Sequence, residues 1–463
     1  MHIWIGVEDF AKIERAKVCM DQYTLFVGPN NSGKTFLMQL IQGLSDKIVD
    51  FLEEDAMDIL LAEQLEGYCK YVINQDNIGQ LLAYINDKLN QKKEQLVREI
   101  FGREISIGKL YIDLELEEGI FYQIDLVDGK SLEIENIKKS KVLEEIPMDF
   151  LSIDRGTQWM SGFLSKRSSQ KGTVDWISIA ISAKGSALSA FRIVLRHILE
   201  SDSLFLPASR TGLMLLYRDF FANRADDAVS YRVSDSGVVG SEGWYGGLTQ
   251  PVYGFLRFLQ TYFEKEENIA EYKKELDFFE DNIIEGHISV KKQGDFSYQA
   301  KDGSSTVPMY LASAMVNEVT PLVLALTSEK RYGRLIIDEV EASLHPQKQL
   351  EMARFLNRIH NKGMKLVLST HSDTFVSKLN NLYVLSEQWN KQKKEEAEKR
   401  FHVEPEDLIS AETLFVYEFV FQDDGRSIVK EIVPDPKMGF KFDLFTKPAM
   451  ELYEEALRIG ENH

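Results

Sequence analysis

The sequence predicts an α/β fold, because an apolar run near the N-terminus leads into a glycine-rich turn and then into a helical pattern. The run is Leu25-Phe26-Val27, and the helical pattern starts at Phe36. Two later apolar runs, 334–337 and 365–368, each end in polar side chains. These observations predict a strand, a loop and a helix at the start of the fold, and two further buried strands from the second half of the chain.

The glycine-rich turn has the composition of a phosphate-binding loop, Gly28-Pro29-Asn30-Asn31-Ser32-Gly33-Lys34-Thr35. Backbone N–H groups that point inward at a helix N-terminus can hold several negative charges without a buried countercharge for each. The two glycines allow the turn. Lys34 can reach the outer phosphates, and the hydroxyl of Thr35 suits a bridging magnesium ion. ATP and Mg²⁺ are therefore the expected ligands.

The second half of such a site is expected on a distant strand that ends in carboxylates. The run Arg334 to Ile337 ends in Asp338 and Glu339. We expect Asp338 to hold magnesium through water, and Glu339 to act as the base that polarises the attacking water. An apolar strand that ends in two acids could be only a solvated strand end, but its combination with the phosphate loop favours the catalytic interpretation.

The segments that follow narrow the class. Val340-Glu341-Ala342-Ser343-Leu344-His345-Pro346 comes directly after the acids, and the run from Lys365 ends in Thr370-His371-Ser372. They resemble the ABC-type ATPases of the RecF, SMC and OLD (overcoming-lysogenisation-defect) branch, and the run from Ile5 to Ile13 is similar to that branch too. The resemblance covers roughly residues 1–43, 105–210 and 285–385. It implies a P-loop NTPase of the ABC-ATPase type with a flanking antiparallel sheet and helical insertions.

The resemblance also implies roles for single residues. The segment from Glu341 to His345 would cross to a second subunit, and His371 would contact the γ-phosphate and the attacking water. Arg210 ends a segment, Phe205 to Arg210, where this branch often has a strand leading into its switch, so it would take part in nucleotide sensing. A histidine or an exposed arginine at a strand end needs no function by itself.

The family signature should form a helix start that closes over the ATP of a second subunit. The candidate here is the segment Leu311 to Glu318, in which Ser313 could meet a γ-phosphate in trans. It follows a predicted hairpin, His287 to Val290 and Phe296 to Gln299, and precedes an apolar helix. The usual glycines are absent, and Ala314 and Met315 add bulk. Ser313 could equally be a plain helix cap, and closure could be weak.

The predicted core consists of residues 1–43, 105–210 and 287–385. Apolar residues at helical spacing predict a helical insertion at 44–104, and strand-like alternation at 107–127 predicts the flanking sheet. A second helical insertion, 211–286, contains helices at 253–259 and 265–279 and a Gly- and Ser-rich loop at 234–247. The charged run 391–400 predicts a short solvated helix or a linker. Residues 386–463 extend the core with a strand at 414–421 and a closing helix at 448–459.

Composition limits the remaining possibilities. The 463 residues allow two or three structural units, and a net charge of −19 argues against nonspecific binding of nucleic acid by the whole surface. No apolar run approaches a membrane span and no signal pattern opens the chain, so we expect a cytoplasmic protein. Cys19 and Cys69 lack metal-ligand spacing and are expected as buried thiols.

The function expected from this resemblance is that of a sensor or scaffold ATPase in an anti-phage defence complex. The chain beyond His371 is too short for the Toprim nuclease of many OLD proteins, so an effector would be a separate protein. A homodimer or higher homo-oligomer is expected. Two alternatives stay open: a RecF-like ATPase of DNA repair, and a scaffold that binds ATP with little turnover. A transporter ATPase is disfavoured, because the LSGGQ-type signature is missing.

Overall fold

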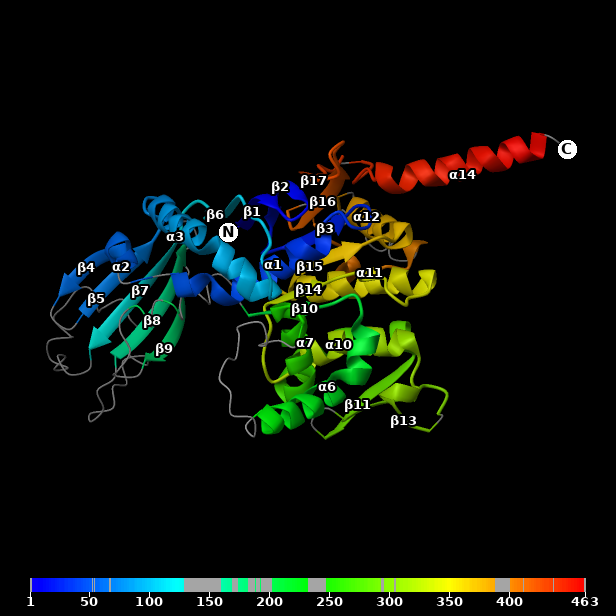
Figure 1. The fold of residues 1–463 in the computed structure, drawn as a ribbon, viewed down its shortest axis with the longest axis horizontal. Helices are drawn as coiled ribbons and strands as arrows, with labels where there is room; N and C mark the ends of the chain where they lie inside the picture. The colour runs from blue at the N-terminus through cyan, green and yellow to red at the C-terminus, as the bar shows by residue number, and fades with distance from the viewer. Residues whose placement is uncertain are drawn as a thin grey trace. The chain divides into compact units, whose positions relative to one another are not determined.

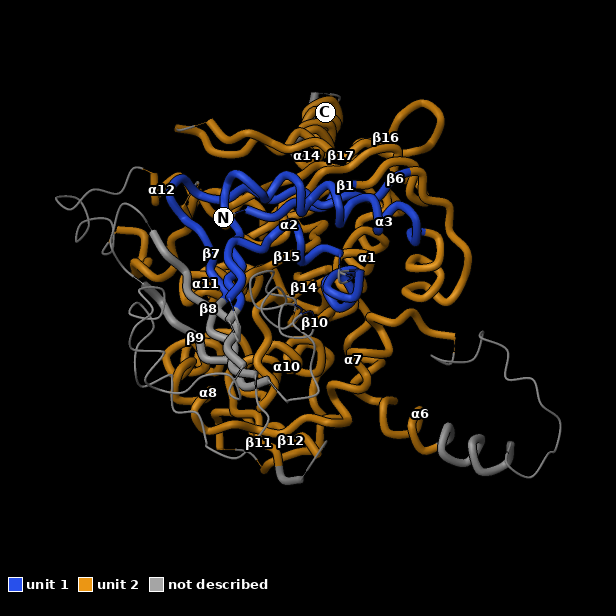
Figure 2. Tube along the Cα trace, turned by 90° about the vertical axis from the view of Figure 1, so that its left-hand side faces the viewer, with its two compact units in different colours: residues 1–6, 44–93, 109–201 blue, residues 7–43, 94–108, 202–463 orange. Residues whose placement is uncertain are grey.

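The computed structural model describes residues 2–51, 53, 55–65, 68–128, 160–168, 174–181, 188, 192, 202–231, 247–292, 295–303, 305–387, 400–410, 412–435 and 437–461. Two compact units can be distinguished (Figure 2). Unit 1 comprises residues 1–6, 44–93 and 109–201, and unit 2 comprises residues 7–43, 94–108 and 202–463. The predicted loop at 234–247 and the charged run at 391–400 lie outside the described residues, except for the last residue of each.

The chain contains both strands and helices (Figure 1). The described strands are β1 (His2–Phe10), β2 (Ile13–Cys19), β3 (Tyr23–Val27), β4 (Leu61–Leu65), β5 (Tyr68–Ile73), β6 (Lys109–Glu115), β7 (Ile120–Asp128), β8 (Met160–Ser168), β9 (Val174–Ile181), β10 (Ser203–Leu206), β11 (Gly286–Lys292), β12 (Asp295–Ala300), β13 (Val307–Pro308), β14 (Arg334–Ile337), β15 (Lys365–Thr370), β16 (Leu414–Phe421) and β17 (Ser427–Glu431). The described helices are α1 (Lys34–Lys47), α2 (Ala56–Leu60), α3 (Ile78–Phe101), α6 (Arg210–Tyr231), α7 (Gln250–Thr261), α8 (Glu266–Glu271), α9 (Lys273–Phe279), α10 (Ala314–Thr327), α11 (Pro346–Asn361), α12 (Asp373–Glu387) and α14 (Asp443–Glu461), with short turns η1 (Ile48–Phe51), η4 (Glu280–Ile284), η5 (Met309–Leu311) and η6 (Pro405–Asp407).

A nine-stranded sheet holds the strands that carry the predicted motifs, in the order β10-β14-β15-β3-β16-β17-β2-β1-β6. The first five strands of this order are parallel to one another, and β16 is antiparallel to β17. β3, β10 and β14 are buried along their whole length, because helices cover the sheet and every side chain meets a packed layer. The core of unit 2 packs these strands against α7, α9, α10 and α11, with the rings of Phe279 and Phe355 at 4.8 Å between centroids.

Unit 1 contains a five-stranded sheet in the order β4-β5-β7-β8-β9, antiparallel throughout. The predicted flanking sheet at 107–127 is only partly confirmed, because β7 belongs to this sheet whereas β6 belongs to the nine-stranded one. The expectation that residues 44–104 are all helical is wrong. β4 and β5 form a hairpin inside that segment, since the aromatic and β-branched residues 68–73 pair with β7. Cys69 in β5 is only partly buried, whereas Cys19 is buried as expected, and both thiols are free.

Several elements of unit 2 follow the sequence closely. The predicted hairpin is β11 and β12, with His287 opposite Gln299 and Val290 opposite Phe296. The predicted strand at 414–421 is β16, which lies beside β3, and the predicted closing helix lies within α14. The acidic helix predicted at 265–279 is instead two helices, because Tyr272 leaves helical geometry between α8 and α9.

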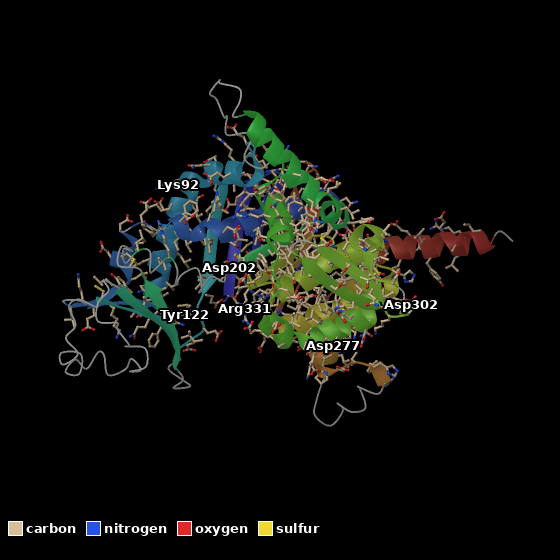
Figure 3. The ribbon with its side chains drawn as sticks, turned by 90° about the horizontal axis from the view of Figure 1, so that it is seen from below. Lys92, Tyr122, Asp202, Asp277, Asp302 and Arg331 are labelled. Atoms are coloured by element: carbon tan, nitrogen blue, oxygen red, sulfur yellow. The ribbon has the colours of Figure 1, made fainter. Side chains whose placement is uncertain are left out.

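Charged side chains lie on the surface of unit 2. Figure 3 labels four that are exposed, Asp202, Asp277, Asp302 and Arg331. Among the described helices, none combines the length and the apolar character that crossing a bilayer would require.

Candidate active site

The predicted site residues meet at one edge of the nine-stranded sheet. Because β3, β10, β14 and β15 are parallel, their carboxyl ends lie together, and loops after such ends form the ligand site of an open α/β sheet. Val27 pairs with Thr370, and Ile337 pairs with Leu368 and with Leu206. The phosphate loop, the two acids, His371 and the segment before Arg210 therefore leave the sheet at neighbouring positions.

The phosphate loop has the backbone geometry that its glycines allow. Gly28 and Gly33 have φ values of +153° and +103°. A β-carbon at Gly28 would lie 2.8 Å from Cβ of Phe419, and one at Gly33 would lie 2.8 Å from Cγ1 of Ile13. Asn31 also has a left-handed conformation, with a φ of +61°. The loop is thus packed so closely against β2 and β16 that only glycine fits at both ends.

Lys34 lies at the first position of α1 and is 5% exposed. Its ammonium group donates to the carbonyl oxygens of Gly28 and Pro29, at 3.0 and 2.8 Å, and to Oγ of Ser32 at 3.4 Å. Burial lowers the pKa of Lys34 to about 8, although the nearby carboxylates of Asp338, Glu339 and Glu341 act in the opposite direction. A phosphate in the loop would add negative charge beside this amine and favour its protonated form.

Thr35 and Asp338 come together across 303 positions of sequence. Oγ1 of Thr35 donates to Oδ2 of Asp338 at 2.8 Å, and Oγ of Ser369 donates to Oδ1 at 2.5 Å. A hydroxyl and a carboxylate so close together are the hard oxygen ligands that Mg²⁺ prefers when it is also bound by phosphates and water. The donor set fits the expected ion, which Thr35 would bind directly and Asp338 would hold through water.

Glu339 has a strained backbone. Its φ is +49°, in the left-handed region that residues with a β-carbon rarely adopt, and its amide donates to Oγ of Ser369 at 2.8 Å. Burial raises the pKa of Glu339, and the neighbouring carboxylates of Asp338 and Glu341 raise it further. Strain of this kind persists where the surrounding structure over-determines it, and it often lies at catalytic positions.

The segment after the acids turns back onto β15. The carboxylate of Glu341 accepts from Oγ1 of Thr370 at 2.7 Å and from the amide of His371 at 2.6 Å. Burial and the charge of Lys34 lower the pKa of His371, so its ring is neutral near pH 7. Within this chain Glu341 therefore positions the backbone of His371. The crossing of residues 341–345 to a second subunit stays a prediction.

Arg210 and Ser313, the other two predicted site residues, lie at the starts of two helices. Arg210 is the first residue of α6 and is 2% exposed, so it is not the exposed arginine that a strand end could carry without function. Its guanidinium donates to the carbonyl oxygens of Asp338 and Glu339, at 2.8 and 3.2 Å. Ser313 is exposed and caps α10, with its Oγ accepting from the amide of Val316 at 3.2 Å. Nucleotide sensing by Arg210 and a contact of Ser313 in trans stay predictions.

Sequence reasoning missed three supporting residues. Ser369 bonds both acids, and Glu318 pairs with Arg210 at 3.0 Å. Ser427 in β17 is fully buried and donates to the carbonyl oxygen of Ser32 in the phosphate loop at 2.5 Å. A polar residue inside an otherwise apolar strand was the available signal for Ser369. The other two contacts span 108 and 395 positions and leave no local pattern.

Comparison with known proteins supports the nucleotide chemistry. Residues 254–376 match the family model of the AAA ATPase domain, a stretch that includes Ser313, Asp338, Glu339 and His371. No significant match was found among proteins of curated function.

Three solved structures match most of this chain at low TM-scores. A Smc head bound to the C-terminal winged-helix domain of ScpA has 10% identity and a TM-score of 0.36, over 93% of this chain and 97% of that one. The Smc head with an extended coiled coil, derived from Pyrococcus furiosus and bound to the C-terminal domain of ScpA, has 11% identity and a TM-score of 0.35, over 98% of each chain. The SMC head domain from Thermotoga maritima has 10% identity and a TM-score of 0.32, over 93% of this chain and 99% of that one.

The phosphate loop lies outside the matched stretch, so the loop and the family match are separate observations. The sheet joins them in one site, with Thr35 from the loop bonded to Asp338 from the matched stretch. From its fold, its site and this match, the protein is an ATPase with a P-loop NTPase fold.

Proposed function

We propose that this protein is an ABC-type ATPase that completes its active site with a second copy of itself and acts as the sensor or regulatory subunit of an anti-phage defence complex. A separate protein, a nuclease or toxin, would be the effector. The observation that carries the ATPase part is the contact of Thr35 with Asp338 beside the buried ammonium group of Lys34. The defence part is supported by the resemblance of the 338–346 and 370–372 segments to OLD proteins.

In this proposal each side chain has one task. The loop amides and Lys34 bind the phosphates of ATP, and Thr35 and Asp338 hold the magnesium ion, which would neutralise charge that develops on the phosphates. Glu339 accepts a proton from the attacking water, and His371 orients that water against the γ-phosphate. The start of α10 at Ser313 would approach the nucleotide of the second copy.

The binding and turnover steps can be separated by two variants. Lys34→Ala should abolish ATP binding in calorimetry, because it removes charge-assisted contacts to the phosphates. Glu339→Gln should bind ATP as the parent does but release phosphate about 100-fold more slowly, the scale for loss of a general base. Lys330→Ala, at an exposed lysine that pairs with Asp202 at 3.7 Å, is the matched control for the first change. Equal ATP affinity of Lys34→Ala and parent would refute the site.

The defence role needs a test in cells. A phage-sensitive host should be protected when it expresses the protein together with the product of the neighbouring gene, and Lys34→Ala should remove that protection while Lys330→Ala keeps it. Unchanged plaque counts with the parent pair would contradict the proposal. ATP-dependent binding of DNA by the purified protein would then favour the repair ATPase instead.

The scaffold alternative has one observation in its favour. Ala314 and Met315 stand where a signature helix usually has glycine, and the hydroxyl of Ser313 is already used as a helix cap. Tight ATP binding without phosphate release by the parent, together with protection by Glu339→Gln, would support that alternative.

A further inference from the structure

A buried ion pair connects the end of the catalytic strand to the helix that begins beside Ser313. The pair consists of Arg210 and Glu318, whose side chains are 2% and 3% exposed, with Nη2 and Oε1 at 3.0 Å. A buried ion pair is weak evidence for stability, since both charges have lost their hydration. Stability alone therefore does not explain this ion pair, and the other contacts of Arg210 and Glu318 indicate its role.

Arg210 holds the backbone of the two catalytic acids. It donates from Nη1 to the carbonyl oxygen of Asp338 and from Nη2 to that of Glu339. A guanidinium group is planar and rigid, so two donors of one group fix the relative position of two successive carbonyl oxygens. From the other side, Ser369 accepts the amide of Glu339 at 2.8 Å. These contacts together hold Glu339 in its left-handed conformation.

The same arginine reaches α10. Its Nε donates to the carbonyl oxygen of Glu318 at 3.0 Å. The other oxygen of the Glu318 carboxylate, Oε2, accepts from the amide and the hydroxyl of Thr211 at 2.9 and 2.6 Å, and that hydroxyl also lies 3.2 Å from the carbonyl oxygen of Ala314. The strand end and the first turn of α10 therefore belong to one hydrogen-bonded network.

Two features weaken the connection between this first turn of α10 and its surroundings. Pro321 lies inside α10 and has no N–H to donate to the carbonyl oxygen one turn earlier, which weakens the helix just after Glu318. Oε1 of Glu318, although 3.0 Å from Arg210, accepts no hydrogen bond of good geometry. The pair can thus improve its alignment when the helix start shifts.

We propose that Arg210 and Glu318 are positioning residues: they hold Glu339 in its catalytic conformation and transmit a change at the nucleotide site to the start of α10 at Ser313. This inference rests on the proposed use of Glu339 and Ser313, and it adds how the two are connected. Nucleotide bound at the loop would shift the Asp338–Glu339 backbone, and Arg210 would pass that shift to Glu318.

The test uses the double variant Arg210→Gln/Glu318→Gln in the full chain. Replacing both charges together avoids the unpaired buried charge that either single change would leave. We expect an unchanged Kd for ATP, because Lys34 and Thr35 are untouched, and a kcat lower by about 10- to 100-fold, the scale for a misplaced catalytic group. Arg210→Lys, which keeps the charge but not the rigid fork, should not restore kcat.

Amide hydrogen exchange measures whether nucleotide binding changes the start of α10. In the parent, ATP with magnesium should slow exchange in peptides that cover residues 313–318, and the double variant should lose this response. A second comparison is made without nucleotide and measures the stability of the end of β14. In the double variant, the amides of Glu339 and Val340 should exchange about tenfold faster than in the parent.

Arg334→Gln is the matched control. Arg334 is also a buried arginine. It begins β14, the strand that ends just before Asp338, and it donates to the carbonyl oxygen of Met20. A purely structural role of Arg210 predicts that both changes affect kcat alike, and that result would overturn the inference. So would parental kcat and a parental ATP response in the double variant. Absence of ATP binding by the parent would instead refute the proposed function, while the nucleotide-free exchange at Glu339 would still decide the positioning role.

Discussion

Single residues of the site are held by neighbours that carry no catalytic role themselves. Ser369 bonds the carboxylate of Asp338 and the amide of Glu339, so one hydroxyl orients both acids. Glu341 does the same for Thr370 and the backbone of His371. These contacts are already made in the protein alone, so Ser369 and Glu341 orient their partners before any nucleotide binds, which is the meaning of preorganisation.

His360, a buried residue outside the site, should make the free energy of unfolding depend on pH. His360 in α11 is buried, its Nδ1 lies 2.9 Å from the carbonyl oxygen of Met364, and burial lowers the pKa of its ring. The unfolded chain binds a proton at this histidine with a pKa of about 6.5, above that of the folded protein. The contribution of His360 to stability is therefore complete above pH 6.5 or so and is lost as pH falls through and below that value.

His360→Gln should remove part of this pH dependence. The amide of glutamine can donate to Met364 but does not titrate. Urea unfolding of parent and variant between about pH 8 and 5 measures the effect as a smaller fall in unfolding free energy for the variant. The same replacement at exposed His402 is the control. An identical fall in parent and His360→Gln would show that this ring does not contribute.

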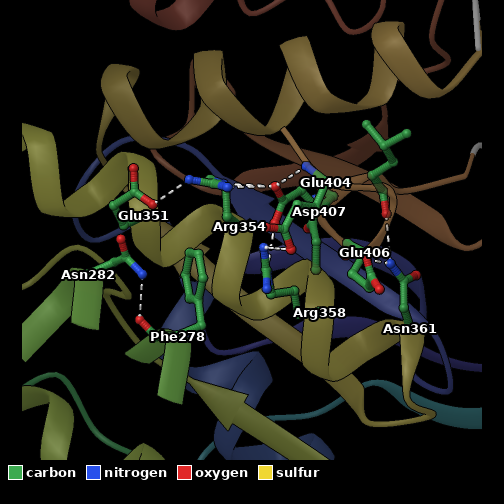
Figure 4. A network of polar contacts seen from close by, with 11 residues as sticks. Phe278, Asn282, Glu351, Arg354, Arg358, Asn361, Glu404, Glu406 and Asp407 are labelled. Carbon is green, nitrogen blue, oxygen red and sulfur yellow. Dashed lines mark hydrogen bonds and ion pairs between the residues drawn. The ribbon is translucent and has the colours of Figure 1, made fainter. Parts of the chain in front are cut away.

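At the scale of the element, a buried network ties α11 to the short turn η6 (Figure 4). The carboxylate of Asp407 is fully buried and accepts from Nε of Arg354 at 2.9 Å, from Nε of Arg358 at 2.7 Å and from the amide of Glu404 at 2.8 Å. Arg358 also lies 4.0 Å above the ring of Phe278. This network therefore holds η6 against α11, the helix that begins directly after the 341–345 loop.

Asp407→Asn should destabilise the protein strongly. The change keeps the shape but leaves two arginines without their buried counter-charge, which costs about 3 to 5 kcal/mol in comparable pairs. The midpoint of urea unfolding measures it. Glu404→Gln is the control, because Glu404 pairs with the same Arg358 at 3.0 Å but is 62% exposed, and such a pair contributes about 1 kcal/mol or less. Similar midpoints for the two variants would contradict the role given to Asp407.

At the scale of the whole molecule, the proposed site is complete only when two copies meet. One copy would supply the phosphate loop and the other the start of α10, which is exposed at Tyr310, Leu311 and Ser313. ATP can favour the paired state only by binding it more tightly than the single chain. The bulk at Ala314 and Met315 leads us to expect a weak effect unless another interface already joins the copies.

Mass measurement in solution on Glu339→Gln, with and without ATP and magnesium, tests this assembly. We expect ATP to lower the apparent dissociation constant of the dimer by about fivefold or more, the lower end of usual coupling. Adding Lys34→Ala to the same protein should remove the effect. A monomer under both conditions, even at high protein concentration, would refute the composite site and leave the ATP-binding scaffold as the better explanation.

Much of the site follows from local sequence, because its parts are continuous segments with strong local constraints. The loop at 28–35 needs glycine at fixed positions, and the strands before it, before Asp338 and before His371 are short apolar runs. The hairpin of β11 and β12 and the strand β16 were predictable for the same reason. In each case the information lies within about ten residues.

The errors and omissions have the opposite cause. Residues 61–65 and 68–73 were expected to be helical but form β4 and β5, because β5 pairs with β7, which lies some 50 positions further along the chain. Tertiary packing decides such ambiguous segments more strongly than local propensity.

The sequence by itself predicted a phosphate-binding loop after one strand and two acids after another. Only the tertiary structure decided that Thr35 meets Asp338, that Ser427 supports the loop, and that Arg210 and Glu318 join the acids to α10. The physical reason is that a parallel sheet brings the ends of sequence-distant strands to one edge, and polar groups buried there must find partners wherever the fold places them.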